Sequence, residues 1–173
     1  MNNEIIKIIT IFLILFGLTK NINAEEPKPS DSHQFNFFSG VFDFTGSPKK
    51  SSEVFGVQHS NEDLFRDTYL GKLSPITGFM MTADSASYFY TGVQAEYKIG
   101  KLNLTPSFSP GLFSMGDGKD LGSPLEFKSE VQLSLDLLPG TKLGYSQSHI
   151  SNADLGDTNP GADSYMFNFM KSF

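Results

Sequence analysis

The chain has 173 residues, a formal net charge of −6 and no cysteine. Without cysteine, disulfides and thiolate metal sites are excluded, and the negative charge argues against a protein that binds nucleic acid phosphates. Hydrophobic residues make up only 39% of the chain, and its length fits a single domain.

The first 24 residues have the layout of a secretory signal peptide. Lys7 precedes an apolar run from Ile8 to Leu18, and the segment closes on the small residue Ala24. That run is shorter than the roughly 18 apolar residues that a membrane-spanning helix needs. We therefore expect residues 1–24 to be a cleaved signal peptide and residues 25–32, which are polar and broken by proline, to be a flexible linker.

The rest of the chain, residues 33–173, alternates between apolar and polar residues. In 89–99, for example, the even positions hold Gln94, Glu96 and Lys98, and 102–108 and 125–135 alternate in the same way. A period of two is typical of strands with one apolar and one polar face, and Gly and Pro punctuate the runs as turns. We expect strands at 34–45, 52–60, 69–82, 86–99, 101–113, 123–137, 141–151 and 164–173.

Eight strands in this length match the smallest outer-membrane barrels. The charged members of the alternating runs would then fill a hydrated interior: Glu96, Lys98, Glu126, Lys128 and Glu130. The last strand ends on Phe173, which resembles the C-terminal signature of such barrels. A soluble β-sandwich would also alternate and is the competing fold. We predict an all-β, eight-stranded antiparallel transmembrane β-barrel of the outer-membrane type over residues 33–173.

The residues that can carry chemistry lie between Ser148 and Asp163. His149 and Ser151 are two apart and share one face of a strand, the face that also carries Leu143. A serine nucleophile needs a base, and the base needs a third group to orient it. Asp163 opens the next strand and could provide that carboxylate. Asn159 could donate to a developing oxyanion, an interaction typically worth about 3 kcal/mol.

Topology places these residues at one end of the barrel. If both termini are periplasmic, the loop at 152–162 lies outside the cell. The predicted site then faces the outer leaflet of a bacterial outer membrane, where lipopolysaccharide resides.

The segment from His149 to Gly161 also resembles a known family. His149-Ile-Ser151-Asn152-Ala153, followed by Asn-Pro-Gly at 159–161, is similar to the lipid A 3-O-deacylases of the PagL type. Shorter fragments at 104–108, 111–113 and 121–127 look like strands of the same family. The resemblance implies an outer-membrane barrel enzyme that hydrolyses the ester-linked acyl chain at the 3-position of lipid A.

By position, the resemblance implies a role for each matching residue. Ser151 is the expected nucleophile, His149 the base, and Asn159 a donor to the oxyanion. The triad acid falls on Asp163, where the best-characterised members carry the longer Glu. Asn152 and Ala153 match the motif as well and are expected to shape the loop.

Other functions remain open at this point. An outer-membrane phospholipase or general esterase could use the same residues, and a non-enzymatic structural barrel would use none of them. The acidic loop at 154–163 could bind calcium, but its spacing does not match an EF-hand. The serine mechanism calls for no cofactor and no metal. The expected partners are lipid A or lipopolysaccharide as substrate and outer-membrane lipids, not nucleic acid; the sequence leaves a homodimer open.

Overall fold

The computed structural model describes residues 32–45, 51–69 and 71–173. The expected signal peptide, and the expected linker up to residue 31, lie outside these residues.

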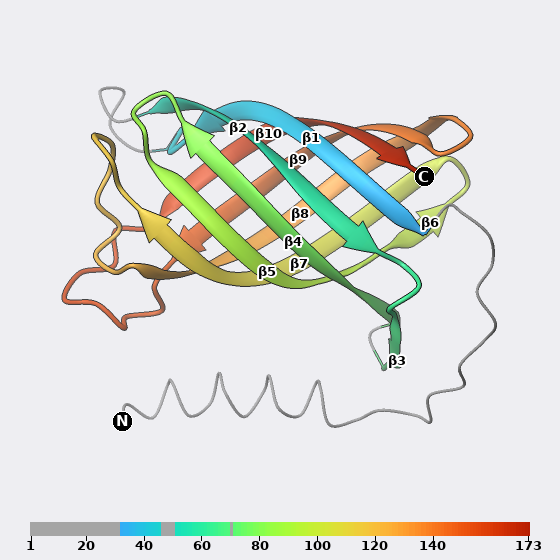
Figure 1. The fold of residues 1–173 in the computed structure, drawn as a ribbon, viewed down its shortest axis with the longest axis horizontal. Coiled ribbons are helices and arrows are strands. Elements are labelled where there is room, and N and C mark those ends of the chain that lie inside the picture. The colour runs from blue at the N-terminus through green and yellow to red at the C-terminus, as the bar shows by residue number, and fades with distance from the viewer. Residues whose placement is uncertain (1–31, 46–50, 70) are drawn as a thin grey trace.

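Eight long strands form the wall of the barrel (Figure 1). They are β1 (His33–Phe42), β2 (Ser52–Asn61), β4 (Gly71–Thr82), β5 (Ser87–Ala95), β7 (Leu102–Ser114), β8 (Leu125–Leu138), β9 (Thr141–Ser151) and β10 (Ala162–Ser172). The short β3 (Arg66–Thr68) pairs with the start of β4, and the short β6 (Tyr97–Ile99) continues the line of β5 along β7.

All neighbouring strands are antiparallel, and β2 also pairs with β4, so the sheet closes on itself. β1 pairs with both β2 and β10. The predicted eight-stranded antiparallel barrel is confirmed, and the soluble sandwich is not what the chain forms. Closure matters physically, because a barrel has no strand edge with unpaired backbone groups to expose in lipid.

Two predicted strands differ from the observed ones for identifiable reasons. The strand expected to run to residue 45 ends at Phe42, because Asp43 has a positive φ of 55° and starts a turn. The strand expected over 86–99 is interrupted at Glu96. The β5–β7 register would place Pro106 opposite Ala95, and proline has no N–H to donate across the ladder.

The outward face of the barrel is a band of exposed apolar side chains. It includes Phe37, Phe55, Phe79, Phe89, Val131, Leu133, Leu135, Leu143, Phe167 and Phe169. Exposed apolar residues on alternate positions of every wall strand are what a lipid-facing surface requires. Among residues 32–45, 51–69 and 71–173, no helix is long and apolar enough to cross a membrane.

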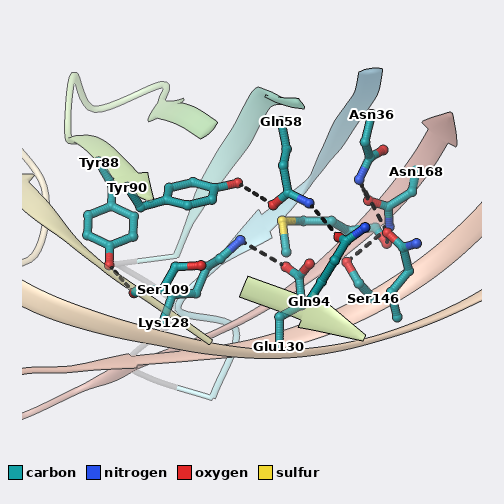
Figure 2. A network of polar contacts seen from close by, with 12 residues as sticks. Asn36, Gln58, Tyr88, Tyr90, Gln94, Ser109, Lys128, Glu130, Ser146 and Asn168 are labelled. Carbon is teal, nitrogen blue, oxygen red and sulfur yellow. Dashed lines mark hydrogen bonds and ion pairs between the residues drawn. The ribbon is translucent and has the colours of Figure 1, made fainter. Parts of the chain in front are cut away.

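The inward face combines polar side chains, which are joined by hydrogen bonds across the barrel as Figure 2 shows, with a cluster of buried apolar ones that includes Phe38, Met80 and Met166. Lys128 is buried, with its Nζ 3.3 Å from Oε2 of Glu130 and 4.0 Å from the centre of the Tyr90 ring. The Tyr90 hydroxyl donates to Oε1 of Gln58 (3.1 Å), and Nε2 of Gln58 donates to Gln94 (3.3 Å). A buried ammonium therefore has both a carboxylate and an aromatic face to offset its lost hydration.

The charged side chains predicted for the interior divide into two groups. Glu126, Lys128 and Glu130 are buried, as expected. Glu96 and Lys98 instead lie exposed, Glu96 at the interruption between β5 and β6 and Lys98 on the short β6. There Glu96 pairs with Lys142 and Lys98 pairs with Asp136.

Candidate active site

The end of β9 presents a histidine and a serine on the outer face of the barrel. His149 is exposed and Ser151 is partly exposed, whereas Ile150 between them and Ser148 before them are buried. This alternation follows directly from the pleat of the strand. The two side chains therefore lie on the outer, lipid-facing surface and not in the interior of the barrel.

The register between β9 and β10 brings the carboxylate to the histidine. His149 lies opposite Asp163 across the two strands, and its Nδ1 is 2.7 Å from Oδ1 of Asp163. An ionised carboxylate can only accept, so Nδ1 carries the proton in this pair. Nε2 is then the basic nitrogen, the one that a serine hydroxyl needs.

A residue far away in the sequence holds the other carboxylate oxygen. The Thr45 hydroxyl donates to Oδ2 of Asp163 (2.7 Å), and the backbone N–H of Phe44 donates to the Asp163 carbonyl (3.0 Å). Thr45 is 118 residues from Asp163 and lies in the turn after β1. The sequence carries no motif there, and only the pairing of β1 with β10 reveals the contact.

A tight turn ends β9 immediately after the serine. The N–H of Leu155 donates to the Asn152 carbonyl (3.0 Å), and the two residues between them, Ala153 and Asp154, have φ angles of 53° and 60°. Two consecutive left-handed residues define a type I′ turn. Such angles are costly for residues other than glycine and are often found at functional sites.

Asn152 fastens that turn to two other loop segments. Its side chain is fully buried, and its Nδ2 donates to the carbonyls of Leu121 (2.8 Å) and Thr158 (2.7 Å). Its backbone N–H donates to Oδ1 of Asn159 (3.1 Å). The loop after Ser151 is thus tied both to itself and to the β7–β8 loop.

Asn159 closes the same loop from the other side. Its Oδ1 accepts from the Asn152 backbone, and its Nδ2 donates to Oδ1 of Asp154 (3.0 Å). In this arrangement the amide organises the loop, and the hydrogen bond that it donates goes to Asp154. Its role as an oxyanion donor stays a prediction, which would use the second hydrogen of the amide.

Further neighbours complete the surface around His149 and were not identified from the sequence. Ser129 on β8 is exposed and lies directly opposite His149. Phe127 on β8 lies opposite Ser151 and stacks on Phe108 of β7, with ring centres 6.0 Å apart. An apolar aromatic surface therefore flanks the serine on the side away from Asp163.

The acidic loop does not assemble into a metal centre in the part of the chain that is described. No group of three or more His, Asp or Glu side chains among these residues could hold a metal ion. Asp154 instead accepts from Asn159, and Asp163 accepts from Thr45 and His149.

With this geometry established, the comparisons with known proteins become informative. A family model described as Lipid A 3-O-deacylase (PagL) matches residues 44–172. The chain belongs to the lipid A 3-O-deacylase family. This confirms the resemblance seen in the segment from His149 to Gly161.

Solved structures agree on the fold. The crystal structure of the outer membrane enzyme PagL matches with a TM-score of 0.63 and 19% identity, over 81% of this chain and 99% of that chain. A de novo designed transmembrane β-barrel matches with a TM-score of 0.54 and 11% identity, over 86% of this chain and 100% of that chain. At these identities the likeness concerns the architecture alone. No curated protein sequence matches the chain.

Proposed function

We propose that this protein is an outer-membrane lipid A 3-O-deacylase that works through Ser151, His149 and Asp163. The observation that carries the proposal is the 2.7 Å contact between His149 Nδ1 and Asp163 Oδ1, made on the lipid-facing side of the barrel. Ser151 shares that face two residues further along the strand. A structural barrel has no need of an oriented imidazole beside a serine at this place.

The chemistry follows from the two nitrogens of the imidazole. Nε2 of His149 takes the proton from Ser151 Oγ as the hydroxyl attacks the carbonyl carbon of the 3-O-acyl ester. The protonated imidazole then gives that proton to the departing oxygen at the 3-position, leaving an acyl-serine. A water molecule, deprotonated by the same nitrogen, releases the fatty acid and restores the serine. Asp163 stabilises the imidazolium in both halves of the reaction.

The position of the site supports a lipid substrate. Figure 1 shows the β9–β10 loop at the end of the barrel opposite to the C-terminus. With a periplasmic C-terminus, the site faces the outer leaflet and its lipopolysaccharide. The stacked rings of Phe127 and Phe108 beside Ser151 offer an apolar surface for the acyl chain.

The test is mass spectrometry of lipid A incubated with the refolded protein in detergent micelles. The wild-type protein should remove one ester-linked 3-hydroxyacyl chain, and Ser151→Ala should remove none. Ser129→Ala is the matched control, because Ser129 is a second outward-facing serine near His149 and lies directly opposite it on β8; this variant should remain active. Full activity of Ser151→Ala would show that another residue is the nucleophile.

A parallel incubation with phosphatidylethanolamine separates substrate classes. Hydrolysis of the phospholipid but not of lipid A would replace the deacylase by a phospholipase that uses the same residues. Inactivity on both lipids, in a protein shown to be folded, would leave the structural-barrel hypothesis.

A further inference from the structure

The turn after β1 makes two bonds to the residue that orients the catalytic histidine. Thr45 donates its hydroxyl hydrogen to Oδ2 of Asp163 at 2.7 Å, and Phe44 donates its backbone N–H to the carbonyl of the same residue at 3.0 Å. The Phe44 ring also packs edge-on against Tyr165, with ring centres 5.3 Å apart. Side chain, backbone and ring contacts therefore all join this turn to the beginning of β10.

The turn is itself bonded to two other segments of the chain. Asp43 is almost completely buried, and its Oδ1 is 2.8 Å from Nζ of Lys119 in the β7–β8 loop. The Ser51 hydroxyl donates to the Asp43 carbonyl (2.9 Å). These two contacts tie Asp43, which lies two residues before Thr45, to the β7–β8 loop and to Ser51.

Asp163 needs such support because its surroundings are open. The side chains of His149 and Asp163 are 53% and 38% exposed, so water or lipid headgroups can compete for the carboxylate. With only one oxygen engaged, the carboxylate can rotate about its Cβ–Cγ bond, a torsion with broad preferences. A second bond, on the other oxygen, removes that freedom.

We propose that Thr45 is a positioning residue for the triad, acting through Asp163 to hold the His149 imidazole in its reactive orientation. The expected effect on catalysis rests on the proposed function, whereas the hydrogen bond between Thr45 and Asp163 is independent of it. The hydroxyl hydrogen of Thr45 is committed to Oδ2, which leaves Oδ1 to accept from Nδ1 of His149.

The decisive variants are Thr45→Val, which keeps the shape and removes the hydroxyl, and Thr45→Ser, which keeps the hydroxyl. Because hydrogen bonds to charged groups are among the stronger ones, Thr45→Val should lower kcat on lipid A roughly tenfold or more, with KM changed less than about twofold. Thr45→Ser should stay within about threefold of the wild-type kcat. Thr77→Val is the matched control. Thr77 is an exposed, outward-facing threonine on β4 that is hydrogen-bonded to Thr91 on β5, and neither strand pairs with β9 or β10.

A double-mutant cycle separates positioning from general packing. In an Asp163→Ala background the hydroxyl has no carboxylate to hold, so Thr45→Val should cause no further loss of kcat. An equal loss in both backgrounds, an unchanged kcat in Thr45→Val, or a Thr45→Ser variant as slow as Thr45→Val would each overturn the inference. Band shift on unheated gels verifies that every variant is a folded barrel.

A measurement that does not depend on turnover tests the role of Thr45 separately from the proposed deacylase function. The Nδ1–H proton of His149 reports on its hydrogen bond to Asp163 and can be observed by NMR in micelles. Its resonance should move in Thr45→Val and stay in place in Thr77→Val. If the wild-type protein fails to deacylate lipid A, the proposed function falls, and the resonance still decides whether Thr45 holds Asp163: no movement in Thr45→Val refutes it.

Discussion

Gly161 offers a sharp test of whether the position of the His149 imidazole limits the reaction. A Cβ added to Gly161 would lie 2.9 Å from Cε1 and 3.3 Å from Nε2 of His149. Ordinary contacts of this kind begin at about 3.4 Å, so the Gly161→Ala methyl group must displace the ring by about half an ångström. Misplacement of a catalytic group by about 1 Å can cost roughly 100-fold in rate. We expect Gly161→Ala to lower kcat about 10-fold or more.

The same substitution also strains the backbone, and this second effect needs its own control. Gly161 has a φ of 58°, where an L residue costs about 1 kcal/mol relative to glycine. Gly100, in the turn before β7, has a φ of 65°, and a Cβ there would meet nothing within 4 Å. Gly100→Ala therefore carries a similar backbone cost without touching His149.

The assay is single-turnover release of fatty acid from lipid A, measured beside the denaturant midpoint of each variant. Both variants should lose a similar, small amount of stability, while only Gly161→Ala should lose activity. Wild-type activity in Gly161→Ala would refute the argument that the loop fixes the ring. Equal activity losses in the two variants would show that backbone strain, and not the contact with His149, is responsible.

Three other substitutions test the proposed triad and the interior separately. Asp163→Asn removes the charge that we propose stabilises the imidazolium of His149. The variant should keep the wild-type unfolding midpoint, while kcat should fall on the order of 10³- to 10⁴-fold. Retention of even a tenth of the activity would exclude Asp163 as the triad acid. Lys128→Met leaves Glu130 buried without its cation, which should destabilise the barrel by about 3 kcal/mol in urea titrations. Lys128→Met combined with Glu130→Gln should recover part of that loss, and a double variant less stable than the single one would contradict the pairing.

The strands of the barrel could be predicted from the sequence because apolar and polar residues alternate along them. Every long strand was predicted, most of them to within two residues at each end. The interruption at Glu96 was not, because it depends on which residue faces Pro106 across the ladder. That cross-strand neighbour is fixed by register, and one sequence contains little information on register.

The residues of the candidate site could be predicted only where they lie close together in the chain. His149 and Ser151 share a face by spacing alone, and the short loop after them makes Asp163 a natural neighbour. Thr45 and Ser129 were missed for the opposite reason, since each reaches His149 or Asp163 only through pairing between strands. Asn159 shows a further limit: its presence in the motif does not reveal that its Nδ2 donates to Asp154.

The interior polar residues also help to set the register between β9 and β10, which positions the proposed catalytic pair. Asn168 on β10 donates to Ser146 of β9 at 3.0 Å and accepts from Asn36 of β1 at 2.9 Å. Sliding β10 by one residue would turn Asn168 toward lipid and Asp163 toward the interior, because successive side chains point to opposite faces. The cost of placing a polar amide in lipid without a partner thus selects the register in which Asp163 faces His149. The inner face of β10 thus holds the proposed catalytic pair, His149 and Asp163, in register.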